Sequence, residues 1–345
     1  MILGTAQVIR ANSRHLPLAD DSVDLVVTSP PYFALRSYQD GGAHYAGQIG
    51  DEPTPDEFVS SLLEVTRECV RVLKPSGSLW VNLGDKYSAH ASGDRARDVR
   101  NGTGQGMYVA GAGQGVAGIR PKSLIGIPWR YALRCIDDLG LILRAEVIWS
   151  KPNGLPESVT DRVRRSHEQW FHFTLQPRYF SAVDEIREAT TPRKGEMTWA
   201  ERKAAGEPAR RGEQGANDAT VNGMTANPLG KLPGSVWTVP TEPLRVPDHL
   251  GVDHFAAFPT EWPKRIIQGW SPEGGTALDP FGGTGTTAMV AKALGRHGIS
   301  VDMSADYCRL AKWRTNDRNQ LAKVLGVAKV DAADPEQLDL FGGAA

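Results

Sequence analysis

The stretch Thr276-Ala277-Leu278-Asp279-Pro280-Phe281-Gly282-Gly283-Thr284-Gly285-Thr286-Thr287 decides the fold. A short apolar strand ends here in a glycine-rich turn, and a helix is expected to follow at residues 286–294. Glycines at a strand end let the backbone approach a ligand closely, and the following helix presents its N-terminal amides. The next strand ends about 20 residues on at Asp302, where a carboxylate can accept hydrogen bonds from both ribose hydroxyls. The pattern predicts a site for an adenosine-bearing cofactor, although an ordinary tight turn is the alternative. NAD is disfavoured because the loop lacks the spacing G-x-G-x-x-G and begins with Asp-Pro-Phe.

A second motif, Thr28-Ser29-Pro30-Pro31-Tyr32, follows another apolar run near the start of the chain. An exocyclic amine on a nucleobase is a poor nucleophile, and two acceptors that bind its N–H bonds would aim its lone pair at a methyl donor. The Ser29 hydroxyl and the Pro30 carbonyl are candidate acceptors, because consecutive prolines fix φ and have no amide hydrogens. Tyr32 offers a face for base stacking worth ~1–3 kcal/mol, against an extrusion cost of a few kcal/mol. The alternative is a diproline turn with a surface tyrosine.

The remaining periodicity predicts alternating strands and helices. Residues 24–28 are apolar, as in a strand covered on both faces, and residues 56–73 form a helical repeat ended by Lys74-Pro75-Ser76-Gly77. Further strands are expected at 7–10, 78–83, 141–149, 169–175, 276–278 and 298–301, and further helices at 127–139, 286–294 and 304–325. The alternation indicates an α/β fold with a mostly parallel sheet and helices on both faces.

The order of the units is circularly permuted, because the β-loop-α unit that normally opens such a fold lies near the end of the chain. Two stretches do not fit the sheet. Residues 84–120 are rich in glycine, and residues 186–233 are polar and basic with one helix expected around 199–205. Long loops of this kind are usually functional or disordered. We therefore expect a single domain over residues 1–345 with two insertions, in which residues 254–326 form the cofactor-binding half.

Composition sets broad limits. The chain has 345 residues and a formal net charge of -1, so any basic surface for a nucleic acid must be local. Candidate clusters, which solvated loop charges would also explain, are Arg95/Arg97/Arg100, Arg162/Arg164/Arg165 and Arg193/Lys194 through Arg210/Arg211. Three widely separated cysteines have no metal-ligand spacing, which predicts reduced thiols and no structural zinc. We expect a cytoplasmic location, because there is no basic-then-apolar leader and no apolar stretch of membrane-spanning length.

The two motifs, in this order, resemble the prokaryotic and phage family of DNA amino-methyltransferases in which the catalytic half precedes the cofactor half. Further segments resemble the same family over most of the chain outside the insertions. They are residues 30–38, Gly47-Gln48-Ile49-Gly50, residues 73–85, residues 122–130, Ile148-Trp149-Ser150-Lys151-Pro152-Asn153, Pro156-Glu157-Ser158-Val159, Ser166-His167-Glu168 and His254-Phe255-Ala256-Ala257-Phe258-Pro259.

The resemblance implies a Rossmann-like methyltransferase fold with S-adenosyl-L-methionine as cofactor. Its implied catalytic residues are Ser29, Pro30, Pro31 and Tyr32. Its implied cofactor-binding residues are Asp279, Pro280, Phe281, Gly282, Gly283, Gly285, Thr286, Asp302, Phe258 and Pro259. Family members often have an acidic residue after the first strand, where this chain has Ala11-Asn12, so Asn12 takes the position near the adenine. His167 and Glu168 are weaker candidates for acid or base catalysis, and Trp149, Lys151 and Trp170 are expected to be wall or phosphate-contact residues.

The function that the resemblance implies is site-specific methylation of a flipped base in double-stranded DNA. Serine before Pro-Pro-Tyr favours N4 of cytosine, with N6 of adenine as the alternative. More distant alternatives are an RNA or protein-glutamine methyltransferase, which usually has Asn before the prolines and the cofactor loop first, and a catalytically silent DNA-binding protein. The region 186–233 is the expected target-recognition region. A restriction endonuclease is a candidate partner, and the oligomeric state stays open between monomer and homodimer.

Overall fold

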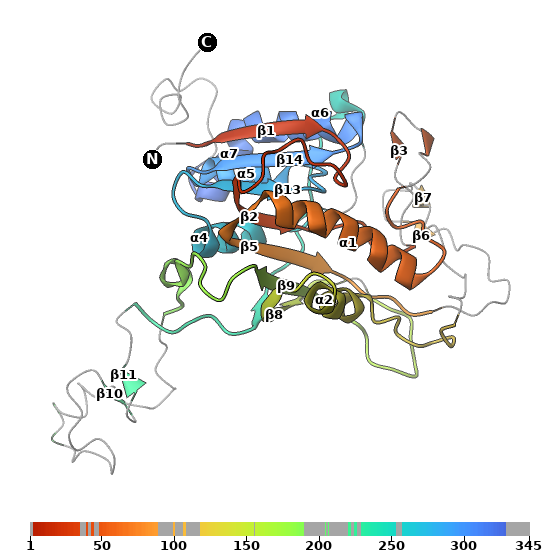
Figure 1. The fold of residues 1–345 in the computed structure, drawn as a ribbon, viewed down its shortest axis with the longest axis horizontal. Coiled ribbons are helices and arrows are strands. Elements are labelled where there is room, and N and C mark those ends of the chain that lie inside the picture. Colours follow the sequence, from red (N-terminus) through yellow and green to blue (C-terminus); the bar gives the residue numbers. More distant parts are fainter. Residues whose placement is uncertain are drawn as a thin grey trace. The chain divides into compact units, whose positions relative to one another are not determined.

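The computed structural model describes residues 3–34, 48–88, 118–154, 156–189, 229–252 and 257–328, with short backbone strands and isolated positions between them. Contacts divide the chain into two units. One comprises Met1–Ser181 and Ser235–Ala345, and the other comprises Ala182–Gly234. The larger unit is an α/β structure around one sheet (Figure 1). The predicted fold class is therefore confirmed.

The sheet has eight strands in the order β1-β14-β13-β2-β5-β9-β8-β12. All neighbouring pairs are parallel except the two that β9 makes, with β5 and with β8. The strands are β1 (Thr5–Arg10), β2 (Val23–Thr28), β5 (Leu73–Leu83), β8 (Ile142–Ser150), β9 (His167–Thr174), β12 (Val236–Thr238), β13 (Thr276–Asp279) and β14 (His297–Asp302). The strands expected at 141–149 and 169–175 are neighbours, as the sequence suggested.

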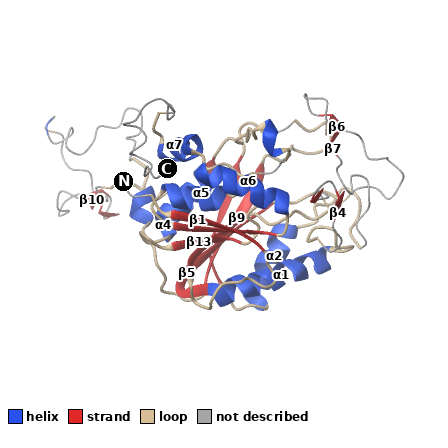
Figure 2. Ribbon diagram, turned by 90° about the horizontal axis from the view of Figure 1, so that it is seen from above, coloured by secondary structure: helices blue, strands red, loops and turns tan. Residues whose placement is uncertain are grey.

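Helices cover both faces of the sheet (Figure 2). One face carries α1 and α2, and the other carries α4, α5 and α6, with α7 packed on α5. Their bounds are α1 (Pro55–Val72), α2 (Ile127–Asp137), α4 (Glu261–Trp270), α5 (Thr286–Ala293), α6 (Ala305–Asn316) and α7 (Arg318–Leu325). Within the described part of the chain, no helix has the length and apolar character that a membrane crossing requires.

Helix α1 shows how the sequence determines an element. Thr54 is its N-cap and accepts a hydrogen bond from the Glu57 amide at 3.2 Å, while the Glu57 carboxylate accepts from the Thr54 amide at 3.2 Å. This reciprocal capping box satisfies two amides that the first turn leaves without partners, and Pro55 has no amide hydrogen to satisfy. Apolar residues at helical spacing then form a buried stripe that includes Phe58, Leu62, Leu63 and Val65.

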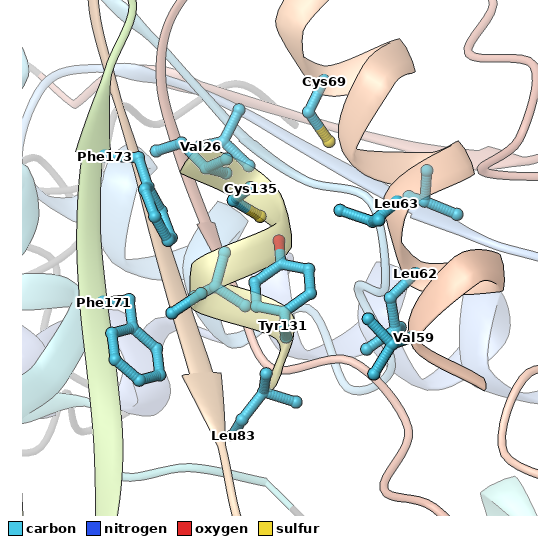
Figure 3. Close-up of a cluster of buried hydrophobic side chains, with 14 of the residues drawn as sticks. Val26, Val59, Leu62, Leu63, Cys69, Leu83, Tyr131, Cys135, Phe171 and Phe173 are labelled. Atoms are coloured by element: carbon cyan, nitrogen blue, oxygen red, sulfur yellow. The ribbon is translucent and has the colours of Figure 1, made fainter. Parts of the chain in front are cut away.

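The core between α1, α2 and the sheet is apolar with one polar contact. Figure 3 shows Leu62, Leu63 and Cys69 of α1 facing Tyr131 and Cys135 of α2, with Phe171 and Phe173 of β9 behind them. The Tyr131 hydroxyl lies 2.8 Å from the Thr66 hydroxyl, so its polar atom is satisfied within the core. Cys69, Cys135 and Cys308 are all buried, and none of them is in a disulfide bond.

A second core, on the α4 face, is built from tryptophan. Trp262 of α4 stacks on Trp170 of β9 with 5.0 Å between ring centroids, and on Trp237 of β12 at 4.9 Å. Trp270 of α4 lies 4.6 Å from Trp80 of β5. Aromatic contacts of this kind couple α4 to three strands of the sheet, and each ring buries a large apolar area.

The topology confirms the permuted order. The late β13–α5 unit lies in the middle of the sheet, and β13 pairs in parallel with β2 through Ala277↔Leu25 and Leu278↔Val26. Carboxyl ends of neighbouring parallel strands meet at one edge, which is where ligands bind in open α/β sheets. The glycine loop after β13 and the diproline turn after β2 are therefore side by side.

Several expectations differ from the structure. The single long helix expected at 304–325 is two helices, because the Asp317 side chain accepts a hydrogen bond from the Gln320 amide at 2.9 Å and caps α7. Strand β5 begins at Leu73 rather than 78, so Lys74-Pro75-Ser76-Gly77 belongs to an irregular strand start. Helix α4 and strand β12 were not predicted at all.

The smaller unit, Ala182–Gly234, contains the 3-10 helix η1 (Val183–Ile186), and a bridge joins Glu188 to Lys231. Its backbone hairpin is β10 (Thr220–Val221) with β11 (Met224–Thr225). Most of the predicted insertion 186–233, including nearly all of the expected helix at 199–205, lies outside the described residues. The same holds for most of 84–120 and for His254 to Ala256. Short backbone strands elsewhere are β3 (Gln39–Asp40), β4 (Ala43–His44), β6 (Val99–Arg100) and β7 (Gly106–Met107), and a second 3-10 helix is η2 (Asp248–Leu250).

Candidate active site

A cavity of about 690 Å³ opens where the two predicted motifs meet. The Thr28 hydroxyl at the end of β2 donates a 2.7 Å hydrogen bond to the Asp279 carboxylate at the end of β13, which ties the two strand ends together. Most of the predicted site residues line this cavity: Asn12, Ser29, Pro30, Pro31, Tyr32, Phe258, Pro280, Phe281, Gly282, Gly283, Thr286 and Asp302. Asp279, Gly285 and Pro259 do not line it. The structure thus gathers both predicted halves around one space.

Glycines in the loop after β13 are required by close packing and by backbone conformation. A Cβ on Gly282 would lie 1.9 Å from the Ser300 hydroxyl oxygen of β14, and one on Gly285 would lie 2.9 Å from the Ala311 Cβ of α6. Gly283 and Gly285 have φ values of 48° and 74°, which side chains rarely adopt. Larger residues would push the loop away from β14 and α6 and change the cavity wall.

Asp302 at the end of β14 is hydrogen-bonded to the backbone of this loop. Its two carboxylate oxygens accept hydrogen bonds from the Gly283 amide and the Ser304 amide, each at 2.9 Å. The side chain also lines the cavity, where carboxylate lone pairs face the space beside the loop. Asp302 can therefore position the loop and bind a hydroxyl-bearing ligand with the same group.

Arg314 of α6 lies beneath the loop. It is only 2% exposed, and one guanidinium nitrogen donates to the hydroxyls of Thr284 and Thr286, each at 2.6 Å. Burial lowers the pKa of Arg314 to about 10, which still leaves it charged at neutral pH. Both threonines line the cavity, so a buried positive charge acts on this wall through their hydroxyl groups.

Asp279 is buried, and its carboxylate accepts hydrogen bonds from three parts of the structure. Its carboxylate accepts hydrogen bonds from Thr28, from the Phe281 amide at 3.1 Å and from the Thr287 hydroxyl at 3.0 Å. Burial raises the pKa of Asp279 to about 6, although these hydrogen bonds oppose the shift. The residue joins β2, the glycine loop and α5.

On the other side of the cavity, the sequence-based prediction missed Asn82 of β5. Asn82 is 1% exposed, and its amide nitrogen donates to the Gln169 carbonyl of β9 at 3.0 Å, which fixes the side-chain orientation. Its carbonyl oxygen accepts from the Ser29 hydroxyl at 3.2 Å. With its hydrogen directed to Asn82, the Ser29 oxygen has lone pairs left to act as an acceptor.

Tyr32 is oriented by two contacts of its hydroxyl group and by the packing of its ring against Gly84. Its hydroxyl lies 2.9 Å from Asn82 Oδ1 and 2.7 Å from Glu168 Oε2, and Glu168 is in turn paired with Lys151. A Cβ on Gly84 would lie 2.6 Å from the Tyr32 ring, so Gly84 allows the ring to lie against the backbone there. The tyrosine is therefore oriented rather than a loose surface residue.

The remaining predicted residues contribute to the cavity walls. Asn12 lines the cavity, and its side chain accepts from the Arg14 amide at 3.0 Å. Phe258 packs edge-on against Trp170 at 5.7 Å, whereas Pro259 is buried and its carbonyl accepts from the Trp262 amide at 3.2 Å at the start of α4. His167 lines the cavity, and burial, with the nearby Arg165, lowers its pKa. No group of three or more His, Cys, Asp or Glu side chains suited to a metal ion occurs among the described residues.

The missed residues had weak signals in the sequence. Asn82 is one polar residue in an otherwise apolar strand near its carboxyl end, which could have marked it. Glu168 and Lys151 were considered, but their pairing depends on the antiparallel register of β8 and β9, in which Trp149 faces Glu168. Gly84 was read as the start of an insertion.

Comparison with known proteins adds independent evidence. A family model described as DNA methylase, of the N6/N4 methyltransferase type, matches residues 23–313. The Type II methyltransferase M.SmaI of Serratia marcescens is 33% identical over 314 residues, which cover 90% of this chain and 91% of the relative. M.XycI of Xanthomonas campestris pv. cyanopsidis is 36% identical over 306 residues, which cover 89% and 85%. The solved structure of PvuII DNA methyltransferase, named as cytosine-N4-specific, has the same fold with a TM-score of 0.60, 18% identity and coverage of 96% and 97%.

Proposed function

We propose that this chain, which belongs to the DNA methylase family that its sequence matches, methylates the exocyclic amine of a flipped base in double-stranded DNA. N4 of cytosine is the favoured acceptor, and S-adenosyl-L-methionine is the methyl donor. The observation that carries the proposal is the shared cavity, in which Ser29 to Tyr32 and the loop from Pro280 to Gly283 line the same space.

The loop side of the cavity fits the cofactor. An adenosine moiety needs an acceptor for its ribose hydroxyls, which Asp302 supplies, and an apolar neighbour, which Phe281 supplies. The carboxylate at the methionine end of the cofactor needs hydrogen-bond donors and a positive electrostatic potential. The N-terminus of α5 has Gly285 as its N-cap with no side-chain cap, and Arg314 lies behind Thr286. S-adenosyl-L-methionine, when bound, would supply a methyl group that its sulfonium makes electrophilic. The neutral thioether that transfer releases is a good leaving group.

The opposite side fits the amine. Ser29, whose hydrogen is directed to Asn82, accepts one N–H of the amine, and the Pro30 carbonyl accepts the other. Binding both N–H bonds biases the nitrogen toward a pyramidal form with its lone pair directed across the cavity. Tyr32 stacks on the base, and its hydroxyl contacts with Asn82 and Glu168 keep the ring at a fixed angle.

No strong general base is needed before the displacement, because the acidity of the amine rises as the new N–C bond forms. Glu168 is already paired with Lys151 and bonded to Tyr32, so its role is to position the tyrosine. The amine proton leaves to water after transfer. Burial lowers the pKa of His167, which also lines the cavity, and this shift disfavours a role as an acid.

The choice of base rests on Ser29. A neutral hydroxyl can both donate and accept, whereas an ionised aspartate at that position would only accept. Serine before Pro-Pro-Tyr favours cytosine N4 through the family resemblance, and adenine N6 is the second candidate.

The wider assignments are part of the same proposal. The segment 186–233 carries target recognition, the protein acts in the cytoplasm as a monomer or homodimer, and a restriction endonuclease is its candidate partner.

Methyl transfer from tritiated S-adenosyl-L-methionine tests the proposal. We expect label in duplex DNA that contains the target sequence, and none in RNA or protein. The variant Ser29→Ala should bind the cofactor as tightly as the wild-type chain does and should transfer label more slowly, because it lacks one amine acceptor. Label in RNA or protein alone would contradict the proposed substrate.

A further inference from the structure

The loop between β8 and β9, residues 151–166, borders the active-site cavity at both ends, and all of it except residue 155 is described. Its residues that line the cavity are Lys151, Asn153, Gly154 and Glu157 near β8, and Arg165 and Ser166 near β9. Both ends of this loop therefore belong to the wall of the cavity that contains Ser29 and Tyr32.

Two arginines of the loop, Arg162 and Arg165, contact residues outside it, and a third, Arg164, bonds within the loop. The Arg162 guanidinium lies 3.8 Å from the ring centroid of Tyr87 and donates to Glu157 at 2.7 Å. Arg164 donates to the Gly154 carbonyl at 3.0 Å. Arg165, whose side chain is 13% exposed, lies 3.4 Å from the Asp85 carboxylate. Arg162 and Arg165 thus join the end of the loop to Tyr87 and Asp85, whereas Arg164 is exposed.

Val163 lies between Arg162 and Arg164. It is 85% exposed, more than any other large apolar side chain in the described residues. Single exposed apolar residues are ordinary on protein surfaces, so exposure alone carries no conclusion. Here, however, the residue lies two positions before Arg165, which lines the cavity, and next to Arg162, which pairs with the cavity-lining Glu157. A β-branched side chain also loses little rotamer freedom when it is inserted between other groups.

Moving a base from a duplex into a cavity leaves a gap in the stack and costs a few kcal/mol. Proteins that distort DNA frequently insert apolar side chains between base steps. We propose that Val163 is a wedge that enters the base stack of duplex DNA at the target position, where it occupies the space that the extruded base leaves. This inference rests on the proposed function. The group that Val163 would contact is the base step at the target position of the duplex.

The variant Val163→Ala tests the wedge on two substrates. On a matched duplex, kcat/KM for methyl transfer should fall about tenfold, because each of the two methyl groups removed contributes about fourfold when buried. On a duplex in which the target base is mispaired, extrusion costs less, and the variant should come within about twofold of the wild-type chain. Val163→Ile should retain activity on both substrates.

Leu133→Ala is the matched control. Leu133 is an exposed apolar residue on α2, and its truncation should leave both substrates unaffected. Cofactor affinity and thermal stability should be unchanged in all variants. An unchanged rate of Val163→Ala on matched DNA would overturn the inference alone, and so would an equal deficit on matched and mispaired DNA. Absence of transfer by the wild-type chain to any DNA would instead overturn the proposed function.

Discussion

Asn82 is the residue on which the amine-binding side of the cavity depends, since its carbonyl oxygen lies within hydrogen-bonding distance of both the Ser29 and the Tyr32 hydroxyls. Its own orientation is set by the bond to the Gln169 carbonyl. Loss of a fixed acceptor lets both hydroxyls rotate away from the geometry that the amine needs.

We therefore expect Asn82→Ala to lower turnover by roughly tenfold to a hundredfold, which corresponds to one or two hydrogen bonds of about 1.5 kcal/mol. Cofactor affinity should change little, because Asn82 lies on the amine side of the cavity. Steady-state kinetics and calorimetry measure the two effects. Asn316→Ala, at the exposed end of α6, is the control. A variant with weakened cofactor affinity and normal turnover would show that Asn82 was placed on the wrong side.

Arg314 gives a prediction for the cofactor side. Arg314→Met keeps much of the side-chain volume but removes the donor to Thr284 and Thr286, so we expect lower thermal stability and weaker cofactor binding. Arg309→Met on the same helix removes an exposed pair with Asp306 and one hydrogen bond to the Leu250 carbonyl, and it should lower stability by less than Arg314→Met does. Equal behaviour of the two variants in thermal melts and calorimetry would contradict the assignment.

Asp279 predicts a pH dependence of stability. Its folded-state pKa of about 6 is above the ordinary value of 3.8, so the folded state favours the protonated form. The contribution of this group to stability is fully present below pH 3.8 and is lost as pH rises through about 6. The variant Asp279→Asn does not show that loss, because an asparagine side chain does not ionise. The melting temperature of the wild-type chain minus that of the variant should therefore fall between about pH 4 and pH 6.5 and level off above that range. A constant difference would refute the shifted pKa.

Some of the site could be predicted from these residues and some could not. Ser29 to Tyr32 and Asp279 to Gly285 are contiguous motifs whose turn chemistry is local, so the sequence identifies them directly. Asn82 and Gly84 lie at or just after the end of β5 and Glu168 lies on β9, so they meet only through the pairing of these two strands. That register is a property of the folded sheet and is not encoded in any short segment.

At the scale of the element, the glycine loop depends on its fit against β14. Gly282→Ala would place a methyl group 1.9 Å from the Ser300 hydroxyl oxygen and 2.9 Å from its Cβ. We expect a loss of stability of about 1–3 kcal/mol and weaker cofactor binding, because either the loop or the strand must move.

The double variant Gly282→Ala with Ser300→Gly is the matched test of this fit. Removal of the Ser300 side chain makes room for the new methyl group, so part of the lost stability and affinity should return. Denaturant unfolding and calorimetry on the two single variants and the double variant give the coupling. Strictly additive effects would show that the contact does not set the loop position.

The elements themselves were predictable to different extents. Helix α1 was recovered because its capping box and apolar stripe are both local in sequence. Helix α4 was missed because it has only ten residues, which include Pro263, so its buried apolar residues make a short helical repeat. The break between α6 and α7 was missed because Asp317 continues a helical charge pattern, and its role as a cap is visible only in the backbone.

At the scale of the whole molecule, the separate unit Ala182–Gly234 and the larger catalytic unit suggest a division of labour. We predict that exchange of residues 186–233 for the corresponding segment of a relative changes the DNA sequence that is methylated and leaves the methylated base type unchanged. Arginines there suit phosphates and guanine edges. Sequencing of methylated sites after expression of the chimera measures this. Retention of the original target sequence would assign recognition elsewhere.

The central claim is that one cavity brings a methyl donor to the exocyclic amine of a DNA base. Its most direct test is mass spectrometry of nucleosides from duplex DNA incubated with the purified chain and S-adenosyl-L-methionine that carries a deuterated methyl group. The account predicts deuterium-labelled N4-methylcytosine. Labelled N6-methyladenine alone would contradict the choice of base that rests on Ser29, and a label at carbon 5 of cytosine, or no labelled nucleoside at all, would contradict the central claim.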